Sequence, residues 1–188
     1  MQTEGNPWKI VSEQTVYDNN WIGLTEYQVI NPAGNPGIYG KIRFKNIAIG
    51  VFPLDEELNT YLVGQFRFPL NQYSWEMPEG GGAIGTDPLT SAQRELLEET
   101  GLVAKSMTLV NVYSGEEFYY KYPHGDQVYN VVATYICRKF EGELKKEESE
   151  VQELNFFSIN NLPNNLSPPD MPIIREYIKN YIGLYLGN

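Results

Sequence analysis

The stretch RELLEETG, residues Arg94–Gly101, decides how this sequence is interpreted. It lies in a segment with clear signals for both ends of a helix. Asp87 suits the N-cap, Pro88 suits the first helical position, where a missing N–H costs nothing, and Gly101 suits a left-handed C-terminal cap. We therefore predict a helix over residues 88–100.

The predicted helix carries three glutamates that crowd like charges together. Glu95 precedes Glu98 by three residues and Glu99 by four, so at about 100° per residue the three carboxylates should gather in one small volume. That volume should point away from the buried stripe of the helix, which consists of Leu89, Ala92 and Leu96. Like charges at this spacing destabilise a helix, and the helix dipole disfavours anions near its C-terminus. The crowding therefore needs a compensating cause.

Two causes are compatible with this pattern. One is an acidic face in solvent, with Arg94 and Lys105 as partial compensation. The other is a site for a divalent cation such as Mg²⁺, which prefers oxygen ligands. The glycine-rich loop Pro78–Pro88 in front of the helix favours the cation site, because glycines let the backbone come close to a bound ligand.

Composition narrows the class of protein. The chain has 188 residues, enough for one domain or one domain with an appendage, and 24 Asp+Glu against 14 Lys+Arg give a net charge of −10. This charge argues against nucleic acid and anionic membrane surfaces as partners. The apolar runs are too short to span a membrane, and the N-terminus lacks the features of a signal peptide. With Cys137 as the only cysteine, we expect a cytoplasmic protein without disulfides.

The rest of the pattern predicts an α+β fold, a mixed sheet covered by helices. Alternating apolar segments predict strands at residues 8–30, 40–54, 59–70, 103–122, 127–140 and 153–157. The strands at 40–54 and 59–70 should pair through the acidic turn Asp55–Glu57. A second helix is expected from Pro172 to about Tyr185, because apolar residues recur there at helical spacing.

Gly80 together with Arg94–Leu102 resembles the Nudix box, in which a glycine loop precedes the pattern Arg-Glu-apolar-any-Glu-Glu-any-Gly-apolar. The resemblance implies a Nudix-type α/β/α sandwich with a mixed sheet. It also implies that the loop and helix bind Mg²⁺, or Mn²⁺ in its place, and the diphosphate of a nucleotide derivative.

The family's functional residues carry over by position to the matching residues of this sequence. Glu95 and Glu99 correspond to metal ligands, and Glu98 to a further ligand or a supporting partner. Arg94 corresponds to the residue that braces the glutamates, and the backbone carbonyl of Glu79 to another metal ligand.

One position departs from the box. Thr86 stands where the family has a glutamate, and a neutral hydroxyl cannot supply that charge. The departure puts the number of metals and the rigidity of the site in doubt. Asp87, the next residue, is a candidate to compensate.

The segment Leu62–Gly82 is similar to the branch of the family that contains ADP-ribose and nucleoside-diphosphate-sugar pyrophosphatases. That branch carries a Gln-aromatic-Arg-aromatic strand and an acid-apolar-Pro segment, here Gln65–Phe68 and Glu76–Pro78. By this resemblance, Arg67 contacts a phosphate or ribose of the substrate, and Glu76 contacts a ribose or base edge. The alternatives are an ordinary strand arginine and an acid at the edge of a sheet.

The N-terminal part resembles the β segment that this branch exchanges between the subunits of a dimer. The chain should therefore consist of an antiparallel β segment, residues 1–45, which holds a homodimer together, and a Nudix hydrolase domain, residues 46–188. Trp21, Tyr27 or Tyr17 offers an aromatic plane on which a nucleobase can stack. The alternative for each is ordinary packing.

Related enzymes place a general base on a late loop, and EESE, Glu147–Glu150, lies at a matching place. Glu147 and Glu148 are the candidates, with Glu150 behind them, and an acidic turn in solvent is the alternative. His124, the only histidine, lies on a predicted turn and is either structural or a substrate contact. Cys137 is expected in the core.

Together these features predict Mg²⁺-dependent hydrolysis of a diphosphate bond, with ADP-ribose giving AMP and ribose 5-phosphate. Two alternatives stay open. One is a Nudix hydrolase for another nucleotide sugar, a dinucleoside polyphosphate or a nucleoside triphosphate. The other is a module of the same fold that senses a nucleotide without turnover. Thr86 favours the module, and the intact Arg94–Leu102 half of the box favours a hydrolase.

Overall fold

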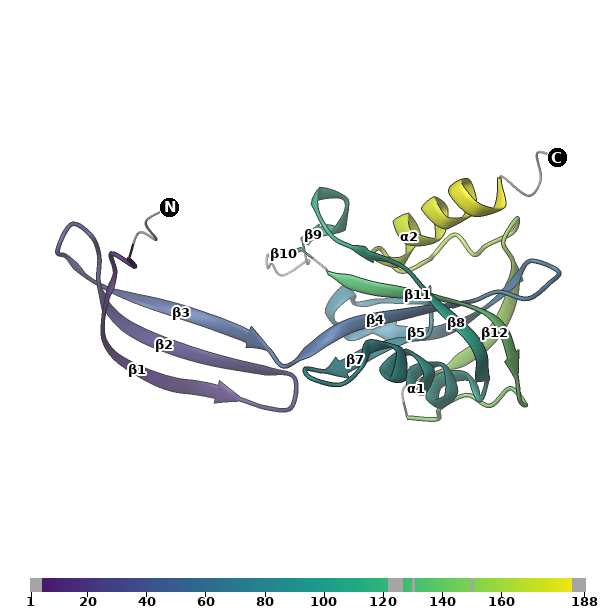
Figure 1. Ribbon diagram of the computed structural model, residues 1–188, viewed down its shortest axis with the longest axis horizontal. Coiled ribbons are helices and arrows are strands. Elements are labelled where there is room, and N and C mark those ends of the chain that lie inside the picture. Colours follow the sequence, from purple (N-terminus) through teal and green to yellow (C-terminus); the bar gives the residue numbers. More distant parts are fainter. Residues whose placement is uncertain (1–4, 122–126, 130, 150, 184–188) are drawn as a thin grey trace. The chain divides into compact units, whose positions relative to one another are not determined.

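The computed structural model describes residues 5–121, 127–129, 131–149 and 151–183. The chain divides between Asn46 and Ile47 into two compact units (Figure 1). The N-terminal unit is an antiparallel sheet in the order β1-β2-β3, made of Lys9–Asp18, Ile22–Ile30 and Pro36–Phe44. Gly34, with φ of 86°, supports the turn between β2 and β3, where a side chain would be strained.

The second unit contains two sheets. The first has the order β7-β4-β11-β8, with β11 parallel to β4 and antiparallel to β8. Its strands are β4 (Asn46–Pro53), β7 (Glu79–Ala83), β8 (Val103–Tyr113) and β11 (Val132–Glu141). The second sheet is antiparallel in the order β12-β5-β6, with β5 (Asn59–Arg67), β6 (Gln72–Glu76) and β12 (Glu153–Ser158). A small pair is formed by β9 (Tyr119–Lys121) and β10 (Gln127–Tyr129).

Two helices cover these sheets. The first, α1 (Pro88–Thr100), begins and ends as predicted: the Asp87 side chain accepts a hydrogen bond from the N–H of Leu89, and Gly101 adopts a φ of 75°. The second, α2 (Asp170–Tyr177), continues as a π-helical turn over Ile178–Ile182. Short 3-10 turns lie at Phe68–Leu70 and Glu116–Phe118.

Strand β4 supplies side chains to two apolar clusters. Ile49 and Val51 pack in a cluster with Ala92 and Leu96 of α1. Phe52 and Leu54 belong to another cluster, which includes Ile173 and Ile174 of α2. Figure 1 shows the two helices on opposite sides of the sheets, which confirms the predicted α/β/α sandwich with a mixed sheet.

The predicted pairing of residues 40–54 with 59–70 is wrong. Lys45 separates β3 from β4, and β4 and β5 belong to different sheets, joined by a single bridge between Leu54 and Thr60. The acidic turn is present, because Asp55 accepts hydrogen bonds from the backbone and side chain of Asn59. The turn therefore leads the chain from one sheet to the other. Both strands carry apolar residues, and the apolar face of each strand must be buried against its own partner.

The strand predicted over residues 103–122 is also too long. β8 ends at Tyr113, and Gly115, with φ of 107°, lies at the start of the 3-10 turn that follows.

Among the described residues, no helix is long and apolar enough to cross a membrane.

Candidate active site

Helix α1 buries two of its three crowded glutamates. Glu95 and Glu99 keep 7% and 6% of their surface exposed, whereas the Glu98 side chain is 51% exposed. The expectation that all three share one volume away from the apolar stripe is therefore inaccurate. At about 100° per residue, Glu99 lies only about 60° from Leu96 around the helix axis, and Glu98 about 160°. The buried pair borders the core, and Glu98 lies at the rim.

The loop in front of α1 fits closely around Glu95. A Cβ at Gly80 would overlap the carboxyl group of Glu95, so only glycine allows this approach. Arg94 joins loop and helix: its guanidinium donates to Glu95 at 2.6 Å, to Glu98 at 2.8 Å and to the carbonyl of Gly81 at 3.0 Å. This is the geometry that a bracing residue requires.

Glu99 lies in the most acidic part of the site. Its Oε2 accepts a hydrogen bond of 3.0 Å from the backbone N–H of Glu79. Burial nevertheless raises the pKa of Glu99 to about 9, and the neighbouring carboxylates of Glu79, Glu76 and Glu95 act in the same direction. A cation beside Glu99 would reverse this shift, because it favours the ionised form.

Arg67 at the end of β5 is anchored by two acids. Its Nε donates to Glu76 at 2.7 Å, and its Nη2 donates to Glu79. Burial acts to lower the pKa of Arg67, but the Glu79 and Glu76 carboxylates outweigh it and raise the pKa. Glu76 has no exposed surface and also accepts a hydrogen bond from Gln65. The geometry favours a role for Glu76 in holding Arg67 over direct contact with a ribose.

A fourth buried acid, Asp170, was not found from the sequence. It is 1% exposed, begins α2, and accepts a hydrogen bond of 2.8 Å from the N–H of Met77. Burial raises the pKa of Asp170 well above its ordinary value, and Glu79 and Glu76 raise it further. Asp170 thus belongs to the same acidic cluster as Glu76 and Glu79. Only its position before an apolar helix could have signalled it.

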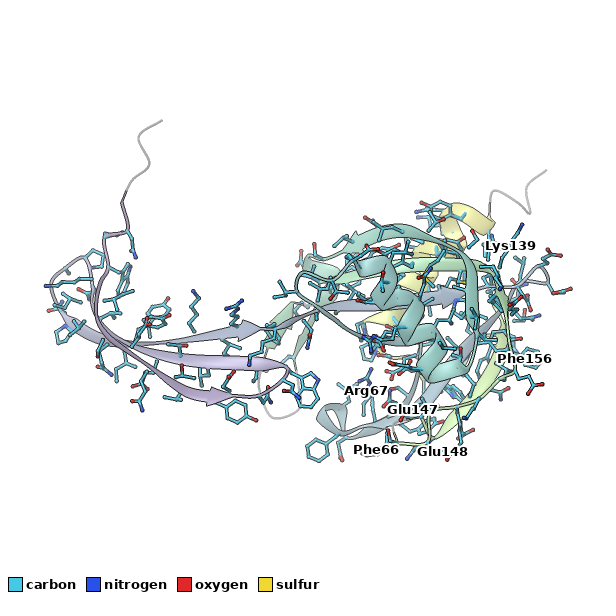
Figure 2. All side chains as sticks on the ribbon, turned by 60° about the horizontal axis from the view of Figure 1, so that its bottom comes forward. Phe66, Arg67, Lys139, Glu147, Glu148 and Phe156 are labelled. Carbon is cyan, nitrogen blue, oxygen red and sulfur yellow. The ribbon has the colours of Figure 1, made fainter. Side chains whose placement is uncertain are left out.

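The late acidic loop lies between α1 and β5. The N–H of Lys145 donates to the carbonyl of Thr100, and the N–H of Gln152 donates to the carbonyl of Gly64. Glu148 lines a groove of about 950 Å³ with Arg67 and a second one of about 560 Å³ with Glu98. Figure 2 shows the labelled Glu148 near Arg67 and Phe66, with which it lines the larger groove. The structure thus brings the candidate bases to the end of the box helix.

The remaining candidates belong to other parts of the chain. Trp21, 66% exposed, and Tyr17, 53% exposed, belong to the N-terminal unit, as does the half-buried Tyr27. Thr86 is exposed on a turn closed by its N–H to the carbonyl of Ala83, so it takes no part in the buried cluster. Cys137 is buried as predicted, and burial raises the pKa of its thiol to about 11. His124 and Glu150 lie outside the described residues.

The donor set fits a Mg²⁺ ion. In the part of the chain that the structure describes, no three Asp, Glu, His or Cys side chains are arranged as a complete metal cage. Mg²⁺ does not need one, because it usually takes one or two carboxylates plus water and substrate phosphates. Two buried carboxylates on one helix, Glu95 and Glu99, with a glycine cradle at Gly80, provide that smaller set.

A helix that follows a glycine loop, buries two carboxylates and packs on a mixed sheet is typical of the Nudix fold. The family model of the NUDIX domain matches residues 44–180, so the chain belongs to this family and is a Nudix pyrophosphohydrolase. A second model, the nucleoside diphosphate sugar hydrolase N-terminal domain, matches residues 8–42.

Curated relatives and solved structures agree with this assignment. The chain is 27% identical over 146 residues to the ADP-ribose pyrophosphatase of Bacillus subtilis, covering 78% of this chain and 76% of that protein. It is 31% identical over 111 residues to the ADP-sugar pyrophosphatase of Mus musculus, covering 53% and 51%. A solved ADP compounds hydrolase superposes with a TM-score of 0.65 at 17% identity, covering 92% of this chain and 94% of that one, which supports the fold.

Proposed function

We propose that this Nudix hydrolase cleaves the diphosphate bond of ADP-ribose with water, using Mg²⁺, or Mn²⁺ in its place, to give AMP and ribose 5-phosphate. The observation that carries the proposal is the buried pair Glu95 and Glu99 on the matched Nudix helix, packed against Gly80. The relatives named for ADP-ribose and ADP-sugars, together with the match of residues 8–42, support the substrate class.

The residues divide the work by position. Glu95, Glu99 and the backbone carbonyl of Glu79 would hold the Mg²⁺ ion, with Glu98 as a partner at the rim. When bound, the ion supplies positive charge to the diphosphate and makes water more acidic. This charge matters in a protein of net charge −10, which otherwise repels an anionic substrate.

Other side chains position the substrate and take up the proton. Arg67 faces the groove that Glu148 also lines, and it can offer N–H groups to a phosphate while Glu76 and Glu79 hold it in place. Glu148, with 82% of its side chain exposed, accepts the proton of the attacking water. The water oxygen bonds to one phosphorus, the bridging P–O bond breaks, and one proton is released.

We further propose a homodimer held through the N-terminal unit, residues 1–45 of the expected domain division. Ten large apolar side chains of this unit are exposed, and an apolar groove of about 570 Å³ runs along it, lined by Trp8, Ile10, Tyr27, Val29, Tyr39 and Ile42 among others. Exposed apolar surface of this kind is typical of protein interfaces. A role of Trp21 in stacking a nucleobase and a cytoplasmic location stay predictions.

A substrate panel tests the proposed activity. Wild-type protein with Mg²⁺ is incubated with ADP-ribose, GDP- and UDP-sugars, a dinucleoside polyphosphate and a nucleoside triphosphate, and phosphate release is measured after coupling to a phosphatase. The highest kcat/KM is expected for ADP-ribose. A higher value for another compound would move the assignment to a different Nudix substrate, and binding without release from any of them would favour the sensing module.

A further inference from the structure

The segment before α2 runs beside β6 and ends at Asp170. The N–H of Trp75 donates to the carbonyl of Asn165 at 2.9 Å, and the N–H of Ser167 donates to the carbonyl of Trp75 at 2.7 Å. After Trp75, the next backbone N–H that faces this segment is that of Met77. The segment itself has by then turned into α2, so its backbone no longer provides the acceptor. The side chain of Asp170 takes the place of the missing backbone acceptor, at 2.8 Å.

This contact holds the segment that leads into the glycine loop. Met77 and Asp170 are 0% and 1% exposed, so solvent water does not reach this hydrogen bond. Two residues further on, the Glu79 N–H donates to Oε2 of Glu99. Asp170 is therefore connected through the Met77–Glu79 segment to a carboxylate of the box helix.

We propose that Asp170 is a positioning residue, which fixes the Met77–Glu79 segment so that Glu79 and Glu99 are correctly placed for the metal. This inference rests on the metal site proposed above. Asp170 itself does not touch metal or substrate in this account. Its effect reaches the metal site through the backbone of the Met77–Glu79 segment.

The pair Asp170→Ala and Asp170→Asn separates positioning from simple loss of a buried group. Alanine removes the carboxylate and leaves the Met77 N–H without its acceptor in a dry interior. Asparagine has nearly the same size and keeps an oxygen that can accept from the Met77 N–H. If Asp170 acts by geometry, asparagine should restore what alanine loses.

The readout is the dissociation constant for Mn²⁺ without substrate, measured by electron paramagnetic resonance of free Mn²⁺. We expect Asp170→Ala to weaken Mn²⁺ binding by about 10–100-fold, as removal of a partner of a metal ligand typically does. Asp170→Asn should stay within about threefold of wild type, since the amide oxygen still accepts from the Met77 N–H. Hydrogen exchange of the Met77 amide should accelerate in Asp170→Ala and not in Asp170→Asn.

Ile173→Ala, one turn further along α2, is the matched control. Ile173 is 2% exposed, so its truncation should lower the thermal midpoint, but Mn²⁺ affinity should stay within about twofold. If Asp170→Ala does not fold, Asp170→Ser replaces it, because the shorter serine side chain does not reach the Met77 N–H as the carboxylate does.

Three results would overturn the positioning role. They are Mn²⁺ binding by Asp170→Ala or Asp170→Ser within about twofold of wild type, equal losses in Asp170→Asn and Asp170→Ala, or an equal loss in Ile173→Ala. A wild-type protein that binds no Mn²⁺ would contradict the proposed metal site together with this inference. Mn²⁺ binding without turnover would contradict only the proposed function.

Discussion

The N-terminal sheet and the Nudix unit carry similar apolar strand patterns, yet they bury them very differently. In the Nudix unit, Leu54, Leu62 and Ile174 have no exposed surface. In the described part of the N-terminal unit, Val29 is the one buried apolar side chain, while Trp21 and Ile38 remain 66% exposed. The same alternation that predicts strands in both units thus says nothing about what covers them.

The difference indicates two kinds of stability. The Nudix unit has helices on both sides of its sheets and can hold itself together through its own core. A three-stranded sheet without such cover is marginal on its own, and a large exposed apolar surface is typical of a binding site for another chain. We therefore assign catalysis to the Nudix unit, which buries charged side chains, and dimer assembly to the N-terminal unit, which exposes apolar side chains.

The largest effect is expected from a cavity in the Nudix core. Ile174→Ala should lower the free energy of unfolding by about 2–5 kcal/mol, because Ile174 is fully buried against other apolar side chains. Val16→Ala, at an exposed position of β1 outside the groove, should change the same transition by less than about 0.5 kcal/mol. Urea unfolding followed by near-ultraviolet circular dichroism measures both. Equal losses would mean that the two units share one core.

The next effect is on catalysis. Glu95→Gln and Glu99→Gln should each lower kcat by at least about a hundredfold with the fold intact, since metal-held charge in the transition state is worth several kcal/mol. Glu141→Gln is the control, because Glu141 is exposed and pairs with Lys105. Steady-state kinetics on ADP-ribose with saturating Mg²⁺ gives the values. Near-full activity in both glutamine variants would contradict the proposed metal site.

Charge placed on the N-terminal groove should break the dimer. The double variant Ile10→Asp, Ile42→Asp puts two carboxylates on the apolar lining of the groove. We expect the dissociation constant of the dimer to rise at least about tenfold, because desolvating a charge at an interface is costly. Val112→Asp, at an exposed position of β8, should leave the dimer unchanged. Sedimentation velocity of all three proteins provides the test. A wild-type monomer of 21.5 kDa at micromolar concentration would contradict the proposed assembly.

The smallest effect is expected at Thr86. Thr86→Glu should raise activity or tighten Mg²⁺ binding by no more than about tenfold, because residue 86 is exposed on a turn outside the buried cluster. A Mg²⁺ titration with ADP-ribose and two nucleotide sugars compares it with wild type. A silent wild type beside an active Thr86→Glu variant would mean that the natural chain is a sensing module.

The parts of the fold that could be predicted from the sequence are the local ones. The caps at Asp87 and Gly101 lie within a few residues of the bonds they make, so α1 was predicted with its correct ends. The assignment of β4 and β5 to separate sheets could not be predicted, because both strands show the same alternation, and their partners β11 and β12 are far along the chain.

In the site, too, the contacts between residues close in sequence could be predicted, and the contacts between distant residues could not. The glutamates of α1 stand together in the sequence, and their spacing showed that they cluster, although not that Glu98 stays at the rim. Asp170 and Met77 are 93 residues apart, and only the finished fold brings them within 2.8 Å. Non-local contacts of this kind leave no periodic signal in a single sequence.

Mg²⁺-dependent hydrolysis of ADP-ribose is tested most directly by measuring how the activity of the wild-type protein depends on the metal. Products are separated by chromatography after incubation with Mg²⁺, after addition of excess EDTA, and after Mg²⁺ is restored. We expect equal amounts of AMP and ribose 5-phosphate with Mg²⁺, none with EDTA, and full recovery when Mg²⁺ is restored. Cleavage that continues unchanged in EDTA, or ADP-ribose that is bound but never cleaved at any Mg²⁺ concentration, would contradict this expectation.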